Sequence, residues 1–410
     1  MQVRMILIVV ALSILVALPA VAQEDWNVTG AGARAEGLGG AFIGLADDAT
    51  AISWNPAGLG QLERSEFSVV GRWIGEQFTY ENPTRPAVNY SINQSHFTYN
   101  FASIAFPLHA GKINIVPAVA FQKQLDSFQK YDVNDEEYES NGGANTLTPG
   151  IGIKLHPMIY VGGTANIWLG NFDNKTTTKG TTPFGFDENN GSYKGLNFTA
   201  GLLIDFEGMK TPVPIKVGAT VRTPFDLKVE GDYKWSTGTR VDEQGSFENS
   251  VQVPLMFGVG ASGRIGENLT IAFDFESRLY GDRKLYRKGR TQAGLERQDT
   301  IKLSASEQDL NQIRVGAEYL IVTRAGVIPV RAGFHTVPTL RANWDVNDKP
   351  DGQVAGTGFS VGTGFIGGAI AIDVTYSQTR WEQKFAVTAT NTATSEYLSQ
   401  MVSVSAIIYF

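Results

Sequence analysis

The stretch Val402-Ser-Val-Ser-Ala-Ile-Ile-Tyr-Phe410 ends the chain and alternates apolar residues with small polar ones. Successive side chains of a β-strand point to opposite faces, so this pattern gives a strand with one apolar face. An apolar face that ends in a carboxyl-terminal phenylalanine is typical of the last strand of a bacterial outer-membrane β-barrel. The alternative is an amphipathic edge strand of a soluble sheet, which rarely ends a chain on an aromatic ring. The stretch therefore predicts a transmembrane β-barrel.

The same two-residue period recurs upstream. Apolar and polar residues alternate over 198–205, 269–276, 313–319 and 370–377. Between Ile215 and Trp235 most odd positions are apolar and most even positions are charged or polar. Because this phase is kept throughout, we expect a single long strand there, which Pro224 can kink.

Continued along the chain, this pattern gives fourteen strands, an even number, as a bacterial barrel requires if both chain ends lie on one side. The strands are 66–74, 93–107, 111–123, 146–155, 157–170, 195–206, 213–235, 249–263, 267–279, 310–322, 325–336, 356–366, 368–380 and 398–410. Short connections alternate with long polar ones such as 124–145, 171–194 and 281–309. A soluble β-sandwich has no reason to sort its loops in this way. The predicted fold class is all-β, an antiparallel transmembrane β-barrel over residues 66–410.

The amino-terminal residues read as an export signal. Arg4 is followed by an apolar run to Pro19, and Ala20-Val-Ala22 has the small-x-small pattern of a cleavage site. The run is too short to cross a membrane comfortably as a helix. We expect residues 1–22 to be removed, which leaves 410 − 22 = 388 residues with a formal charge of −8 after the loss of Arg4 from −7.

The composition excludes several classes of function. The chain has no cysteine, so it has neither disulfides nor thiolate metal sites. Its acidic balance does not favour nucleic acid as a partner. Four histidines lack metal-ligand spacing, and the G-x-G-x-x-A pattern at Gly30 follows no strand. The sequence predicts no enzyme activity, no metal and no cofactor.

A stretch near the amino terminus resembles a known family. Gly39-Gly-Ala-Phe42, Ala46-Asp-Asp-Ala49 and Asn55-Pro-Ala-Gly-Leu59 follow one another within residues 32–59. Their order and spacing resemble the FadL family of outer-membrane transporters for long-chain fatty acids and aromatic hydrocarbons. With the strand count, the likeness covers essentially the mature chain. Some relatives serve secretion systems, so the resemblance does not fix the cargo.

The resemblance implies that residues 23–65 fold into the barrel as a hatch that gates the lumen. The local sequence agrees, because Asp47 or Asp48 can cap a short helix that ends near Trp54. Asn55 followed by Pro56 and Ala57 is a second cap-then-proline start. The residues alone also allow ordinary capped helices with no gating role.

The third strand offers an exit. Pro117 lies on its predicted lipid-facing phase and cannot donate to the ladder, so pairing is weakened in mid-wall. In the FadL family an interruption of the third strand is associated with lateral release of substrate into the membrane. The alternative is a harmless bulge, since strand prolines also occur at Pro254 and Pro329.

Several basic residues lie on predicted inward phases and are candidates for contact with a ligand carboxylate. They are Arg72, Lys112, Arg222 and Arg314. The alternative is that they pair with inward acids such as Asp274, Glu276 and Glu318. The segment 171–194 lacks an amphipathic helical pattern, which argues against a greasy capture groove and against long-chain fatty acid as cargo.

The preferred function is an outer-membrane channel for passive uptake of hydrophobic small molecules, gated by the hatch and releasing its cargo into membrane lipid. The alternative is a barrel component or shuttle of a secretion system with its own protein partner. A nonspecific polar porin is disfavoured, because a plug in a fourteen-stranded barrel leaves little open water path. The barrel-assembly machinery is expected to recognise the last strand through Phe410.

Overall fold

The computed structural model describes residues 30–110, 113–133, 135–179, 185–209, 212–236, 242–388 and 390–410. The expected signal, 1–22, lies outside these ranges. Helices are confined to short pieces: α2 Ala33–Gly37, α3 Ala51–Trp54, η1 Pro56–Gln61, η2 Pro86–Val88 and η3 Phe206–Gly208. Within the described ranges, none of them is both long and apolar enough for a membrane span.

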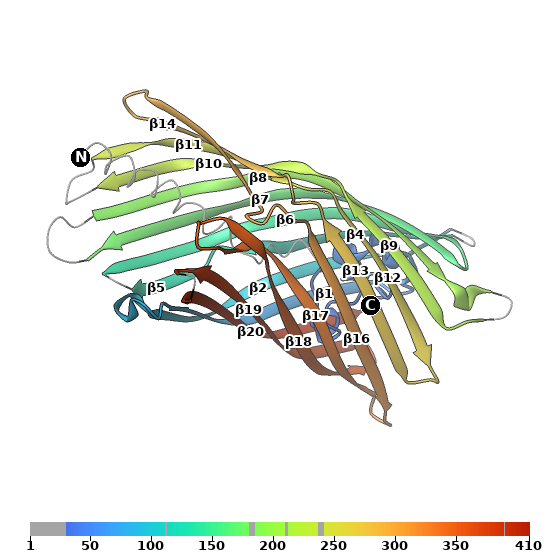
Figure 1. The fold of residues 1–410 in the computed structure, drawn as a ribbon. Helices are drawn as coiled ribbons and strands as arrows, with labels where there is room; N and C mark the ends of the chain where they lie inside the picture. The colour runs from blue at the N-terminus through green and yellow to red at the C-terminus, as the bar shows by residue number, and fades with distance from the viewer. Residues whose placement is uncertain are drawn as a thin grey trace.

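All strand segments of the described chain belong to one sheet (Figure 1). They are β1 Glu66–Glu81, β2 Tyr90–Ala105, β3 Leu108–Ala110, β4 Ile113–Asp126, β5 Gln129–Val133, β6 Glu136–His156, β7 Ile159–Thr178, β8 Gly185–Asp205, β9 Ile215–Arg222, β10 Phe225–Ser236, β11 Glu243–Val253, β12 Met256–Ile265, β13 Leu269–Arg278, β14 Lys284–Thr291, β15 Glu296–Lys302, β16 Leu310–Val322, β17 Val327–Trp344, β18 Pro350–Gly367, β19 Ile370–Ala386 and β20 Thr392–Tyr409. β1 pairs antiparallel with both β2 and β20, so the sheet closes on itself.

The closed wall has fourteen strands, which confirms the predicted fold class. Six of these wall strands consist of two segments that follow one another along the chain. The pairs are β2 with β3, β4 with β5, β9 with β10, β11 with β12, β13 with β14, and β15 with β16. Every predicted strand falls on an observed one.

The connections predicted as long loops are largely β-hairpins. The 171–194 region extends β7 and β8, and 281–309 contains β14 and β15. Their backbone groups continue the ladder because each strand already has a neighbour to pair with. We call the end that carries these extensions the long-hairpin end and the opposite end the short-turn end.

Toward the short-turn end, side chains alternate as in a membrane barrel. On β16, Ile313 and Val315 lie on the outer surface, whereas Arg314 and Glu318 are buried inside. An outer surface of aliphatic and aromatic side chains is suited to lipid, and the interior takes the polar side chains.

The 215–235 prediction is wrong in one respect. In β9 the odd, apolar residues such as Val217 face outward, but in β10 the odd residues Leu227 and Val229 are buried inside. The two segments are separated by Thr223 and Pro224, which leave the ladder and turn the chain over. The odd-numbered residues therefore face the outside of the barrel in β9 and the lumen in β10.

In three neighbouring wall strands, the odd-numbered residues change from one face of the wall to the other in the same way. Their breaks lie at Pro254–Leu255 between β11 and β12, at 279–283 between β13 and β14, and at 303–309 between β15 and β16. We call these positions, with Thr223–Pro224, the inversion level. Beyond it, buried apolar side chains form a cluster that we call the hairpin-end core: Leu125, Ala144, Trp168, Phe172, Tyr193, Leu227, Val229, Val251, Val253 and Leu285.

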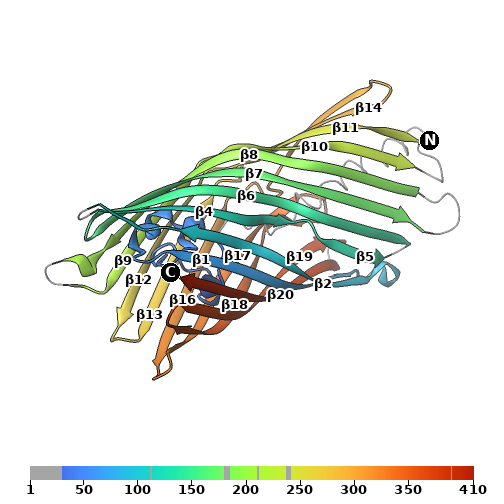
Figure 2. The ribbon, with the colours of Figure 1, turned by 180° about the vertical axis from the view of Figure 1, so that it is seen from behind.

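Residues 30–65, the first that the structure describes and drawn in blue, lie inside the barrel at the short-turn end, close to the carboxyl terminus (Figures 1 and 2). We call residues 30–65 the lumen segment. It contains α2, α3 and η1, and it contacts β4, β6, β7 and β8 on one side and β17, β18, β19 and β20 on the other.

Candidate functional site

The lumen segment is nearly all buried between Gly30 and Leu62. Small residues let its backbone touch the wall. Gly39 has a positive φ of 67°, and a side chain there would reach within 2.7 Å of the Phe334 amide nitrogen. The facing wall residue, Gly333, is equally tight against Gly39. This close approach explains why both positions hold glycine.

Hydrogen bonds from the wall hold the segment on the side of β12, β13, β18 and β19. The Asp274 carboxylate accepts from the Phe42 and Ile43 amides at 2.6 and 2.7 Å. Ser360 Oγ accepts from Gly39 N, and Thr375 Oγ1 donates to the Ala33 carbonyl at 2.6 Å. Buried backbone groups that would otherwise lack partners are thus satisfied by barrel side chains.

A charged network supports the same side. Arg34 pairs with Asp47 at 2.5 Å and with Glu318 at 3.0 Å. Arg331 pairs with Glu318 and Asp373, both at 2.6 Å. Burial opposes the charge on Arg34, but its acidic neighbours outweigh burial and hold the Arg34 pKa well above its usual value. These ion pairs hold the lumen segment on the wall, because separating buried charges costs several kcal/mol of free energy.

The opposite side of the segment packs mainly through apolar contacts. Val70, Phe101, Ala105, Val116, Ala118 and Ala120 of β1, β2 and β4 belong to the same buried cluster as Leu59 and Leu62. Polar ties occur at the margins of this side: Arg72 pairs with Glu36, Glu66 of β1 accepts from Ala49 N at 2.8 Å, and Asn114 Nδ2 donates to the Gly60 and Leu62 carbonyls. The lumen segment is thus anchored by polar groups on the side of β12, β13, β18 and β19, and it packs on an apolar surface on the side of β1, β2 and β4.

The predicted caps are present in modified form. Asn55 Oδ1 accepts from Ala57 N at 3.2 Å, and Pro56 opens η1 as expected. Asn55 Nδ2 also donates to the Ile43 and Leu202 carbonyls, which fixes η1 to β8.

The acidic pair divides its roles. Asp48 accepts from Thr50 N at 2.9 Å, just before α3, whereas Asp47 pairs with Arg34. Burial raises the pKa of Asp48, and the Arg34 guanidinium offsets part of that rise. The gating role of these residues remains a prediction.

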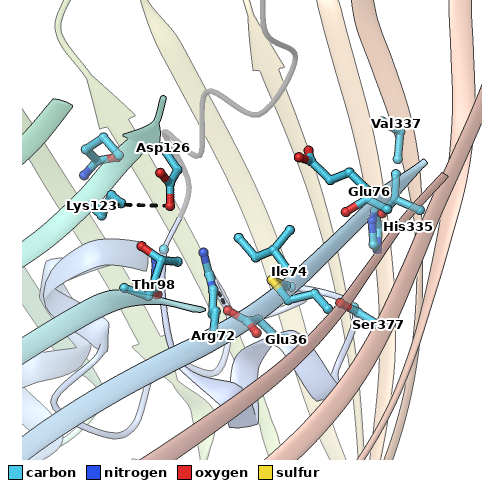
Figure 3. A pocket seen from close by; sticks show the side chains of 18 of the residues that line it. Glu36, Arg72, Ile74, Glu76, Thr98, Lys123, Asp126, His335, Val337 and Ser377 are labelled. Atoms are coloured by element: carbon cyan, nitrogen blue, oxygen red, sulfur yellow. Dashed lines mark hydrogen bonds and ion pairs between the residues drawn. The ribbon is translucent and has the colours of Figure 1, made fainter. Parts of the chain in front are cut away.

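A cavity of about 250 Å³ lies on top of the lumen segment, on the side of the long-hairpin end. Figure 3 shows Arg72 and Glu36 meeting in it beside Ile74, with Lys123 and Asp126 to one side and Glu76 and His335 to the other. Its lining mixes charged groups with apolar ones, among them Trp54, Val337 and Met401.

The structure brings two of the four basic candidates to this cavity, Arg72 and Arg314. Arg314 is already bound, with Glu276 at 3.2 Å and Gln312 Oε1 at 2.6 Å. Arg222 is buried in the wall next to Thr199 and does not line the cavity. Lys112 lies outside the described residues.

Sequence reasoning missed three cavity residues that carry unpartnered polar atoms. Among the described residues, Glu36 Oε2, Asn100 Oδ1 and Gln124 Oε1 are buried without a hydrogen-bond partner. Both amides lie on the inward phase of their strands: Asn100 follows Thr98 and alternates with the exposed Phe97 and Tyr99, and Gln124 follows Gln122. The two-residue alternation is the signal that could have identified them, and each stands at a register shift, between β1 and β2 or between β4 and β6.

Pro117 lies in a continuous strand on one side and beside a break on the other. It pairs with Ile151 of β6 in regular register. Toward β2 it faces Phe106 and Pro107, which separate β2 from β3, and its carbonyl accepts from Phe106 N at 3.0 Å. The ring of Phe106 contacts the terminal Phe410. The regular pairing of the second strand is therefore interrupted at Phe106 and Pro107, opposite Pro117, while one hydrogen bond still spans the seam at that point.

Comparison with known proteins matches this architecture. The family model described as BamG matches residues 31–313. A search of curated proteins finds no match. The fold is similar to that of a FadL homologue from Pseudomonas aeruginosa, at 13% identity and a TM-score of 0.66, covering 93% of this chain and 98% of the other.

Two toluene transporters are similar to the same degree. TodX of P. putida has 12% identity and a TM-score of 0.66, covering 93% of this chain and 99% of its own. TbuX of Ralstonia pickettii has 15% identity and a TM-score of 0.64, covering 94% and 100%. The resemblance to the FadL family is confirmed, and at these identities the likeness concerns the fold.

Proposed function

The chain belongs to the BamG family, and from this premise we propose that it is an outer-membrane channel for passive uptake of small hydrophobic molecules. The fold supports the proposal, since similar barrels include two that are described as toluene transporters. The outward apolar belt places the wall in a membrane, and the lumen holds a cavity of the size of one small molecule. An engineered apolar cavity of roughly 150 Å³ binds benzene, so about 250 Å³ is enough for a substituted ring.

The observation that carries the proposal is the asymmetric anchoring of the lumen segment. Its bonded side, toward β12 to β19, resists movement because charges and buried amides would lose their partners. Its apolar side, toward β1, β2 and β4, can part without breaking hydrogen bonds except at the margins. An apolar solute that enters there replaces one apolar contact with another. We therefore place the gate on this side and treat residues 23–65 as the hatch.

The same surface leads to the interrupted strand pairing in the wall. Ala105 is the last residue of β2 before Phe106 and Pro107, and it belongs to the apolar cluster under the lumen segment. A solute that follows this surface reaches the weakly paired seam opposite Pro117, and opening of that seam would let it leave sideways into lipid. Lateral release avoids water, which favours an apolar cargo. The proposed exit is thus the seam between the β2–β3 strand and β4.

A disulfide staple tests this route, and the chain is suited to it because it has no native cysteine. Ala105 and Ala118 are cross-strand partners at the proposed exit, and Ser68 and Ser103 are partners on the neighbouring β1–β2 seam. We expect oxidised Ala105→Cys/Ala118→Cys protein to lose most toluene uptake in liposomes and to regain it after reduction. The matched Ser68→Cys/Ser103→Cys staple should leave uptake unchanged. Equal uptake with both staples closed would exclude this seam as the exit.

A second candidate is a structural or shuttle role in an outer-membrane assembly such as a secretion system. It is favoured by the degree to which the lumen segment closes the barrel, because a closed barrel suits a scaffold. Affinity purification after mild cross-linking distinguishes the two. A stable protein partner, with no uptake of any hydrophobic probe, would favour the scaffold.

A further inference from the structure

Among the described residues, most of the unpartnered polar atoms around the cavity above the lumen segment accept hydrogen bonds. Glu36 Oε2, Asn100 Oδ1 and Gln124 Oε1 are acceptors, whereas Nδ1 of His96 and of His335 can accept or donate, according to the tautomer. Gln124 gives its N–H to Thr146 Oγ1 at 3.0 Å, which leaves its carbonyl oxygen as the free atom. Asn100 and Gln124 are more than nine-tenths buried.

The basic groups of the cavity are, by contrast, already engaged. Arg314 binds Glu276 and Gln312, and its guanidinium also lies 5.7 Å from the Trp54 ring centre. Lys123 pairs with Asp126 at 3.3 Å, and Arg72 pairs with Glu36. A ligand carboxylate would have to displace a protein carboxylate to reach any of them. A ligand that donates hydrogen bonds displaces nothing and satisfies buried acceptors.

Apolar side chains in the same cavity can contact the apolar part of such a ligand. Ile74, Met401 and Val337 line it, together with the rings of Trp54 and Phe128. Resting on the uptake function proposed above, we infer that the cavity selects small apolar molecules that bear one hydrogen-bond-donating substituent, a hydroxyl or an amine, with Glu36 and Asn100 as its acceptors. Carboxylates and bare hydrocarbons are bound more weakly.

Four probes of nearly equal size test the inference: benzylamine, benzyl alcohol, benzoate and toluene. Binding to the detergent-solubilised full chain is measured by calorimetry, and permeation is measured in liposomes. We expect benzylamine and benzyl alcohol to bind at least tenfold more tightly than benzoate or toluene. The inference is overturned if benzoate binds best, because the arginines would then be the groups that bind the ligand. It is also overturned if all four probes bind with equal affinity.

Two variants assign the preference to residues. Glu36→Gln removes the charge and should weaken benzylamine at least tenfold while it weakens benzyl alcohol less. Asn100→Leu removes an amide oxygen that has no partner, so it costs no hydrogen bond of the fold, and it should weaken both donors several-fold. Unchanged donor preference in correctly folded Asn100→Leu and Glu36→Gln proteins would overturn the assignment.

Glu396→Gln is the matched control outside the cavity. Glu396 accepts from Arg380 at 2.9 Å on the exposed surface and does not line the cavity. This variant should keep the wild-type order of the four probes. If wild-type protein passes toluene but shows no donor preference, this inference fails alone. If no probe permeates, the uptake proposal fails instead.

Discussion

The two ends of this barrel obey opposite rules of sidedness. Toward the short-turn end, apolar side chains cover the outside and polar ones line a lumen that the amino-terminal segment fills. Beyond the inversion level, Asp226 and Lys228 face outward, and Leu227 and Val229 are buried inside. The medium outside the wall explains the difference. In lipid, an apolar outer surface is stable, whereas in water the apolar side chains are more stable when they are buried inside.

The two ends also differ in how they are held together. The short-turn end depends on buried ion pairs and hydrogen bonds between the wall and the lumen segment. The long-hairpin end depends on side-chain packing in the hairpin-end core, and ion pairs such as Lys175–Glu188 lie on its exposed outer face. The same kind of substitution should therefore have different effects at the two ends.

The largest effect is expected from Glu318→Ala, which removes the partner shared by Arg34 and Arg331. Removing one partner of a buried ion pair costs about 3–5 kcal/mol. Arg34 keeps Asp47 and Arg331 keeps Asp373, so we expect the lower part of that range, and the lumen segment should loosen. Thermal unfolding would show the loss of stability, and planar-bilayer recordings should show larger or noisier ion conductance.

Glu188→Ala is the control for that change at the other end. Glu188 pairs with Lys175 on the outer face, and both side chains are partly exposed to water. The expected cost is below about 1 kcal/mol, with no change in conductance. Similar losses in the two variants would contradict the proposed difference between the ends.

Leu227→Ala tests the inversion itself. The side chain is fully buried in the hairpin-end core, so its removal leaves a cavity at a cost of about 2–5 kcal/mol. Val221→Ala lies on the same sequence phase, but its side chain is on the outer surface of β9. It should cost less than half as much in a denaturant titration of the folded barrel. Equal costs would mean that the odd positions do not change sides at Pro224.

Asn55→Ala examines the capped start of η1 within the short-turn end. It removes the bond from Ala57 N and frees the Ile43 and Leu202 carbonyls. Loss of an N-cap costs roughly 0.5–2 kcal/mol. Hydrogen exchange of the lumen segment should become faster while the wall strands keep their protection. Uniformly faster exchange throughout the barrel would show that Asn55 supports the whole fold rather than this segment.

The smallest stability change is expected from Pro117→Val. The substitution restores an N–H that faces Phe106 across the ladder, and one such bond is worth about 1 kcal/mol. Stability should hold or rise, while toluene uptake falls several-fold. Pro329→Val in β17, far from the seam, is the control and should leave uptake unchanged. Retained uptake in Pro117→Val would make this proline a structural feature without a role in release.

Local pattern predicted much of the wall. The alternation around Ile313 and Ile372 fixed strands whose outer residues are where the period placed them. The strands were predicted too short at the long-hairpin end, because their polar extensions lack the apolar alternation that marks a membrane segment. The cap at Asn55 was read correctly because capping depends on residues only two positions apart.

The candidate site was predicted less well. Arg72 and Arg314 were candidates for contact with a ligand carboxylate, with pairing to inward acids as the alternative, and both are paired with acids from distant parts of the chain. Asn100 and Gln124 lie on the inward phases of their strands, so alternation gives their side of the wall. Their free acceptor atoms depend on which groups the neighbouring strands bring within reach, and one strand alone does not encode that.

The sequence by itself determined the barrel, its fourteen strands and the presence of an amino-terminal segment with capped turns, because periodicity and capping are local properties of the chain. Only the tertiary structure decided which side of the wall each residue faces beyond the inversion level, which charges neutralise one another across the lumen, and where the strand pairing of the wall is interrupted. These depend on the register between strands and on the medium that each surface meets, and a two-residue period carries no information about either.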